Sequence, residues 1–180
     1  MFNDKPPIEI EFSLNLDLPN RYKIKGIYIT PTPDKVILSS VDNSEESLRQ
    51  MSNFAVRLCK ILTHTPLRSI GVNFGYFESE SKEDLYDKFS FDKNDPFSEE
   101  GWQIKDYAVK RYMVKEGFDL NFTTTIDENS NFRLEFNYHY NITEKNNIID
   151  LFEKFDILSF KSNSQDLLYN IYKLKLPNND

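Results

Sequence analysis

Apolar and polar residues alternate over several stretches of the chain, a pattern typical of β-strands that bury one face. The alternating stretches are 8–16, 68–77, 118–126 and 132–140, and 21–30, 35–40 and 102–115 are also expected to be strands. Pro31-Thr32-Pro33-Asp34 and Asp127-Glu128-Asn129-Ser130 predict turns between consecutive strands. We therefore expect an antiparallel sheet of about six to seven strands, in which 118–126 and 132–140 form the clearest hairpin.

Helical periodicity occurs in the middle of the chain and at its C-terminal end. Residues 44–63 carry apolar side chains at helical spacing, and Asn43 followed by Glu46 has the pattern of a capping box. Thr143 is expected to cap one C-terminal helix, and Ser162 or Asn163 a second one. The element order predicts a single α+β domain over 1–180, with the central helix and both C-terminal helices packed mainly on one face of the sheet.

Composition narrows the classes of protein to consider. Of the 180 residues, 39% are hydrophobic and 28% charged, and no apolar run approaches the roughly 18 to 20 residues that span a bilayer. The first residues have no basic and apolar pattern of an export signal, so a cytoplasmic protein without membrane contact is expected. Cys59 is the single cysteine, which excludes intramolecular disulfides and cysteine-based zinc sites, and no cofactor is expected.

Negative charge is concentrated in one acidic excursion, residues 78–100. This loop-rich stretch holds nine acidic side chains and only three lysines, whereas the whole chain has a formal net charge of −7. A short helix is expected within it near Lys82 to Phe89. Because the remainder is close to neutral, duplex nucleic acid is not an expected partner. A modest basic cluster does occur in the predicted strand 102–115 and consists of Lys105, Lys110, Arg111 and Lys115.

Aromatic residues interrupt the acidic excursion and its C-terminal flank without a periodicity that would bury them. Phe91, Phe97 and Trp102 are candidates for binding a partner, and the ordinary alternative is that they attach a loop to the domain's own core. A second candidate is the basic face of the central helix, made by Arg49, Arg57 and Lys60. These features favour a non-catalytic interaction protein, a subunit or adaptor of a larger complex that binds another protein or a second copy of itself.

The predicted hairpin gives the rival hypothesis, an enzyme or a small-ligand-binding protein. Its polar face would hold Asn121, Thr123, Arg133, Glu135, Asn137 and His139. Glu135 and His139 lie about 13 Å apart on one strand, so an acid/base role of the histidine requires a partner from a neighbouring strand.

Two metal-binding patterns have simpler explanations. Pro33-Asp34 and Glu80-Ser81-Lys82 match a short nuclease pattern, but a long predicted helix separates the halves. Asp92 to Asp95 carries oxygens at short spacing, yet Phe97 stands where a calcium loop needs glycine. A solvated run of charge and a flexible acidic loop are the preferred explanations of these residues.

Overall fold

The computed structural model divides the chain into two compact units. Unit 1 comprises 1–65, 146–159 and 177–180, and unit 2 comprises 66–145 and 160–176. The structure describes residues 7–13, 19–62, 64–78, 84–89, 96–115, 117–142, 150–152 and 156–174.

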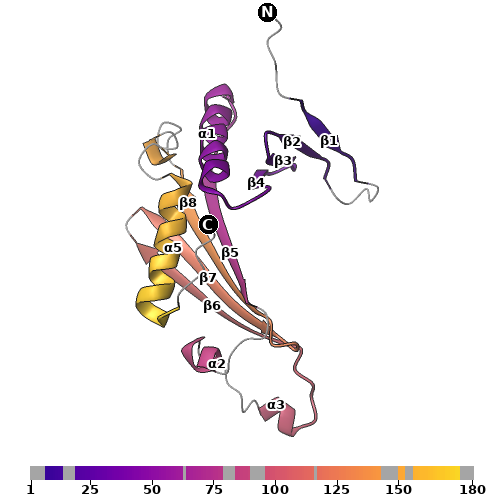
Figure 1. Cartoon of the computed structure of the whole chain (residues 1–180), viewed down its shortest axis with the longest axis vertical. Coiled ribbons are helices and arrows are strands. Elements are labelled where there is room, and N and C mark those ends of the chain that lie inside the picture. Colours follow the sequence, from indigo (N-terminus) through magenta and orange to yellow (C-terminus); the bar gives the residue numbers. More distant parts are fainter. Residues whose placement is uncertain are drawn as a thin grey trace, which may run out of the picture. The chain divides into compact units, whose positions relative to one another are not determined.

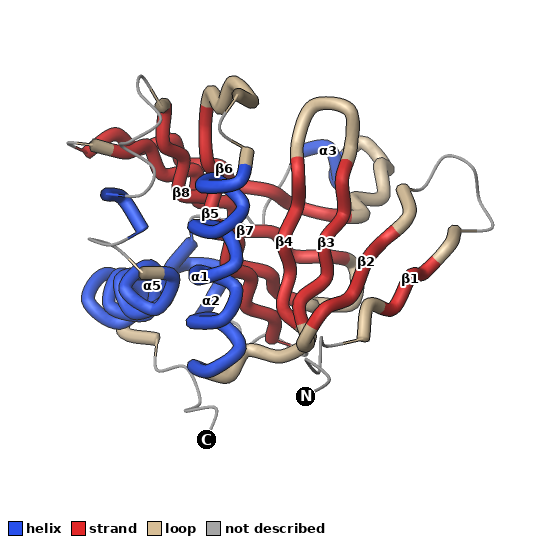
Figure 2. Tube along the Cα trace, turned by 90° about the horizontal axis from the view of Figure 1, so that it is seen from above, coloured by secondary structure: helices blue, strands red, loops and turns tan. Residues whose placement is uncertain are grey.

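Unit 1 contains a four-stranded antiparallel meander. Its strands follow the order of the sequence (Figure 2) and are β1 (Glu9–Glu11), β2 (Arg21–Ile24), β3 (Ile27–Pro31) and β4 (Val36–Ser40). The expected single strand 21–30 is therefore two strands joined by a tight turn. Lys25 and Gly26 both have positive φ, 50° and 75°, as the two-residue turn of a twisted hairpin requires.

Helix α1 (Glu45–Ile61) confirms the predicted central helix, and its contacts are with β3 and β4. The N-cap is Ser44, one residue after the expected Asn43. The Ser44 side chain accepts a hydrogen bond of 3.2 Å from the backbone N–H of Ser47, which satisfies one free donor of the first turn. Leu48 and Ser52 are the buried side chains of this helix.

Unit 2 is built on a second four-stranded antiparallel sheet in the order β5-β8-β7-β6 (Figure 1). The strands are β5 (Ser69–Glu78), β6 (Asp106–Lys115), β7 (Phe118–Asp127) and β8 (Phe132–Asn141). The predicted hairpin is confirmed: β7 and β8 alternate between buried and more exposed side chains along almost their whole length. The expectation of one sheet of six to seven strands was wrong, because strand patterns do not specify which strands pair with one another.

Helix α5 (Ile157–Tyr172) covers the apolar face of this sheet (Figure 1). Phe160, Ser164 and Leu168 are fully or almost fully buried. The ring of Phe160 lies 5.2 Å from that of Tyr138, and Tyr138 Oη hydrogen-bonds Ser164 Oγ at 2.9 Å. An aromatic core therefore joins α5 to the central strand β8.

The C-terminal helices differ from the prediction. Asp156 caps α5, accepting a hydrogen bond of 2.8 Å from the backbone N–H of Ser159, so the proposed caps Ser162 and Asn163 lie inside the helix. Thr143 lies outside the described residues, so its role as a helix cap stays a prediction. Residues 150–152 are helical. Among the described helices, none combines the length and apolar character needed to cross a membrane.

Candidate functional site

Two large aromatic side chains are exposed just before β6. Phe97 lies in the short helix α3 (Pro96–Glu99), and Trp102 follows three residues after its end. Their exposed fractions are 63% and 70%, which is high for residues that usually contribute to a core. Phe91, the third aromatic residue of the sequence hypothesis, lies outside the described residues.

A helix C-terminal motif fixes the backbone of Trp102. Gly101 has φ +85°, the left-handed conformation that glycine adopts without steric cost. The Trp102 backbone N–H then donates to the Phe97 carbonyl at 3.0 Å, the hydrogen bond of a Schellman ending. The exposed indole is thus presented by a defined turn, in which its own backbone is bonded to that of Phe97.

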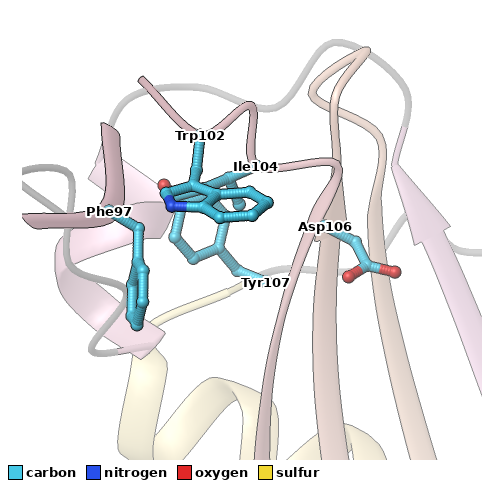
Figure 3. A pocket seen from close by; sticks show the side chains of 5 residues that line it. All are labelled: Phe97, Trp102, Ile104, Asp106 and Tyr107. Carbon is cyan, nitrogen blue, oxygen red and sulfur yellow. The ribbon is translucent and has the colours of Figure 1, made fainter. Parts of the chain in front are cut away.

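Phe97 and Trp102 line an open hollow of about 440 Å³ together with Ile104, Asp106 and Tyr107, and we call these five residues the aromatic patch. Figure 3 shows the rings of Phe97, Trp102 and Tyr107 on one side of the strand that carries Asp106, whereas the Asp106 carboxylate points away from them. The hollow is therefore mainly apolar, with a carboxylate at its border. Its chemistry suits contact with an apolar group.

The acidic excursion is anchored through a different aromatic residue. Helix α2 (Asp84–Phe89) buries Leu85 and Phe89, and the Phe89 ring stacks on Tyr172 with centroids 4.3 Å apart. Arg111 Nη2 donates to the Phe89 carbonyl at 3.3 Å at the end of this helix. The burial of these two residues was not predicted from the sequence, although the spacing of four between Leu85 and Phe89 is typical of one buried helix face.

The six residues of the rival hypothesis do share one face of the unit 2 sheet. The register places Asn121 opposite Asn137, and Thr123 opposite Glu135. On β5, Gly71 and Gly75 stand beside His139 and Glu135. Neither glycine has a positive φ. A Cβ on Gly75 would meet nothing within 4 Å, whereas a Cβ on Gly71 would lie 3.9 Å from the side-chain amide of Asn73, so only the surface over Gly75 is open.

His139 has a cross-strand carboxylate neighbour but no catalytic constellation. Asp119 is its register partner on β7, and Asp119 accepts a hydrogen bond of 2.9 Å from the Tyr112 hydroxyl. Within the part of the chain that the structure describes, neither the His139 nor the Glu135 side chain forms a hydrogen bond or an ion pair. The guanidinium of Arg133 lies over the ring of Phe77, 5.9 Å from its centroid. The face is a polar surface that carries an imidazole, two carboxylates and a guanidinium.

The basic residues of α1 are all exposed. Arg49 pairs with Glu45 at 3.7 Å and with Asp156 at 3.4 Å, so its charge is partly satisfied within unit 1. Arg57 and Lys60 have no ion pair among the residues that the structure describes. They leave a short basic stripe on the exposed side of the helix.

No cluster of three or more metal-ligating side chains occurs among the described residues. No protein-family model matches the chain, and no curated protein and no solved structure is similar to it.

Proposed function

We propose that this chain is a non-catalytic interaction protein, a subunit or adaptor of a larger cytoplasmic complex, and that the aromatic patch contacts its protein partner. One observation carries the proposal: a structured turn presents the Trp102 and Phe97 side chains to solvent. Tryptophan is enriched among the residues that dominate binding energy at protein interfaces, because its large surface desolvates well against an apolar pocket. Self-association through the same patch belongs to this proposal as well.

The contrast with Phe89 supports it. All three aromatic residues belong to the segment that links β5 to β6, but Phe89 is fully buried in the core of unit 2 while Phe97 and Trp102 are exposed. Anchoring this segment therefore does not require the two exposed rings. An exposed aromatic cluster next to acidic residues such as Glu100 and Asp106 suits a partner surface with apolar and basic groups.

The test is quantitative affinity capture from lysate of the native host. We expect a protein captured at stoichiometric amounts by the unchanged chain, and at least tenfold less by Trp102→Ala and Phe97→Ala, since hot-spot truncations cost about 2 kcal/mol or more. Phe77→Ala is the matched control, because Phe77 is a 60% exposed residue of the same unit and does not belong to the aromatic patch. Equal capture by all variants, or no capture by folded protein, would contradict the proposal.

A second candidate function is small-ligand binding on the polar face of β7 and β8. The observation in its favour is the open surface over Gly75, beside Glu135. Chemical-shift changes of Asn137 and His139 on addition of a metabolite library would support it. A library that shifts neither residue, at millimolar concentrations, would count against it.

A further inference from the structure

We infer that β6 and α5 of unit 2 form a second binding site, which takes an extended acidic segment of a partner protein as an added strand. The partner would again be a protein, as in the proposed function, but it would bind a different surface of unit 2. Its three supports are an unpaired strand edge, an apolar cavity beside that edge, and unpaired positive charge along it.

The edge is long and regular. In the described sheet β6 pairs with β7 alone (Figure 1). At the usual rise per residue, its ten residues span about 33 Å. An edge strand presents backbone N–H and C=O groups along its outer side, which an extended peptide can pair with. In monomeric proteins, edge strands are usually short, bulged or covered by another element.

A cavity of about 180 Å³ lies beside the C-terminal half of β6, under α5. Its walls include Met113 and Val114 of β6, Phe118 and Leu120 of β7, and Leu167 and Ile171 of α5. Met113 and Ile171 are both exposed, so apolar surface continues from the cavity to the solvent. A cavity of about 150 Å³ accommodates a benzene molecule, so this one has room for the side chain of a leucine or phenylalanine.

Strand addition explains why the cavity and the edge occur together. Successive side chains of an added strand point to opposite faces of the sheet, so every second residue of the peptide would face α5. Peptide-binding domains that extend a sheet obtain affinity from the backbone pairing and specificity from such side-chain pockets. The opposite edge strand, β5, contributes no residue to the cavity, so only the β6 edge carries this combination.

Charge selects the kind of peptide. Lys110 and Lys115 are exposed on β6 and form no ion pair among the described residues. Lys105, just before the strand, pairs with Glu128, and Arg111 donates to Phe89. Asp106 begins the strand at the far end from the cavity. Three cationic side chains against the single carboxylate of Asp106 give β6 a positive balance, which favours an acidic partner.

The first experiment is selection of displayed random twelve-residue peptides on the full chain. We expect enrichment of sequences with one large apolar residue, acidic residues at neighbouring positions and no proline in the middle. The best sequence is then synthesised, and its affinity for each variant is measured by fluorescence anisotropy.

Ile171→Glu places a charge at the cavity mouth and is expected to weaken peptide binding at least tenfold. Tyr169→Glu is its control, because Tyr169 is an exposed residue of the same helix that does not line the cavity. Lys110→Glu and Lys115→Glu are expected to weaken binding several-fold, while Lys35→Glu in unit 1 has the same charge change and no effect. Circular dichroism verifies that each variant is folded.

Hydrogen exchange identifies the mode of binding. Bound peptide is expected to slow exchange of β6 amides and leave β5 amides unchanged. A selection that enriches nothing, or that enriches basic peptides, would overturn the inference. So would peptide binding that Ile171→Glu does not weaken, or unchanged exchange of the β6 amides. A dimer in sedimentation that Val114→Glu abolishes would overturn it as well, in favour of pairing between two copies. Trp102→Ala should leave peptide binding intact, so the two proposals fail or stand separately.

Discussion

The hydrogen bond between Tyr138 and Ser164 lies inside the unit 2 core. Both side chains are fully buried, and Ser164 Oγ also lies 2.9 Å from the Phe160 carbonyl, to which it donates. Since the serine proton is used there, the Tyr138 hydroxyl acts as donor to Ser164 Oγ. Ser164 therefore links a helix to a strand while satisfying an otherwise isolated phenol.

We predict that Ser164→Ala lowers the free energy of unfolding by about 1 to 3 kcal/mol, because it leaves the Tyr138 hydroxyl buried without a partner. Adding Tyr138→Phe should recover part of the loss, since no unsatisfied hydroxyl then remains. Urea unfolding of the two single variants and the double variant measures this coupling. Ser162→Ala, an exposed serine of the same helix, is the control and should change little.

Two other core tyrosines predict a loss of stability in alkali. Burial raises the pKa of Tyr76 and of Tyr140 to about 12, with a smaller contribution from Tyr138. An unfolded tyrosine titrates near pH 10, so above that pH the unfolded chain releases these protons before the folded chain does. The free energy of unfolding should therefore be unaffected below about pH 10 and fall as the pH rises toward 12.

Replacing both residues by phenylalanine tests this prediction. Neither hydroxyl has a hydrogen-bond partner among the described residues, so Tyr76→Phe with Tyr140→Phe should preserve or raise stability at neutral pH, by about 1 kcal/mol per site at most. In urea titrations at about pH 9, 10 and 11, the double variant should lose less stability than the unchanged chain. An equal loss would show that other groups cause the alkaline transition.

At the scale of elements, two glycines should respond oppositely to the same substitution. Gly26 has φ +75° and Gly75 does not have a positive φ, while a Cβ at either would meet nothing within 4 Å. Gly26→Ala should cost about 1 to 2 kcal/mol through backbone strain in the β2–β3 turn. Gly75→Ala should gain about 0.5 to 1 kcal/mol, because alanine loses less conformational freedom than glycine in a strand. Thermal and urea unfolding of both variants checks the difference in sign.

The anchor of α2 gives a second comparison between elements. Phe89→Ala should destabilise unit 2 by about 3 to 5 kcal/mol, as expected for a large buried aromatic residue, and should expose the acidic excursion to proteases. Phe97→Ala removes an exposed ring and should stay within about 0.5 kcal/mol. Limited proteolysis and urea unfolding distinguish them; similar losses would mean that Phe97 supports the fold.

Local patterns predicted most elements, and failed where the deciding contact is not local. The β7–β8 hairpin and α1 were predicted because alternation and helical spacing persist over ten or more residues. The β2–β3 turn was missed because lysine, at φ 50°, occupies a position where asparagine or glycine is the usual signal. The start of α5 was missed because several polar residues near it are possible caps, and only the fold selects Asp156.

The candidate site was predictable in part. The sequence indicated that Phe97 and Trp102 were candidates for contact, but it did not distinguish them from Phe89, since all three are aromatic residues in one polar stretch. Exposure follows from tertiary packing, which buries the Phe89 ring and leaves the other two exposed. The edge position of β6 could not be predicted from the sequence either, because strand order depends on pairing between distant residues.

At the scale of the whole molecule, net charge should control self-association. The chain carries −7 at neutral pH, and its isoelectric point is about 5.0. Ile8, Ile10 and Phe12, at and beside β1, are exposed apolar residues. As the pH falls toward 5, repulsion between molecules weakens and contacts between such residues become favourable.

We therefore expect the hydrodynamic radius, measured by light scattering, to increase between about pH 8 and pH 5. Ile10→Thr should reduce the increase, because it shortens the exposed apolar row. Gln103→Thr, at an exposed neutral position, should not. A radius that does not depend on pH would rule out charge as the factor that limits association.

The pairing of β5 with β8 has a consequence for synthesis of the chain on the ribosome. β5 ends at Glu78 and β8 begins at Phe132, so at about 5 to 20 residues per second β5 waits roughly 3 to 10 seconds for its partner. During that interval its apolar residues Ile70, Val72 and Phe74 have no sheet to join, and α5 is made later still. Nascent chains that stall before residue 132 are thus the form of this protein that most needs a chaperone.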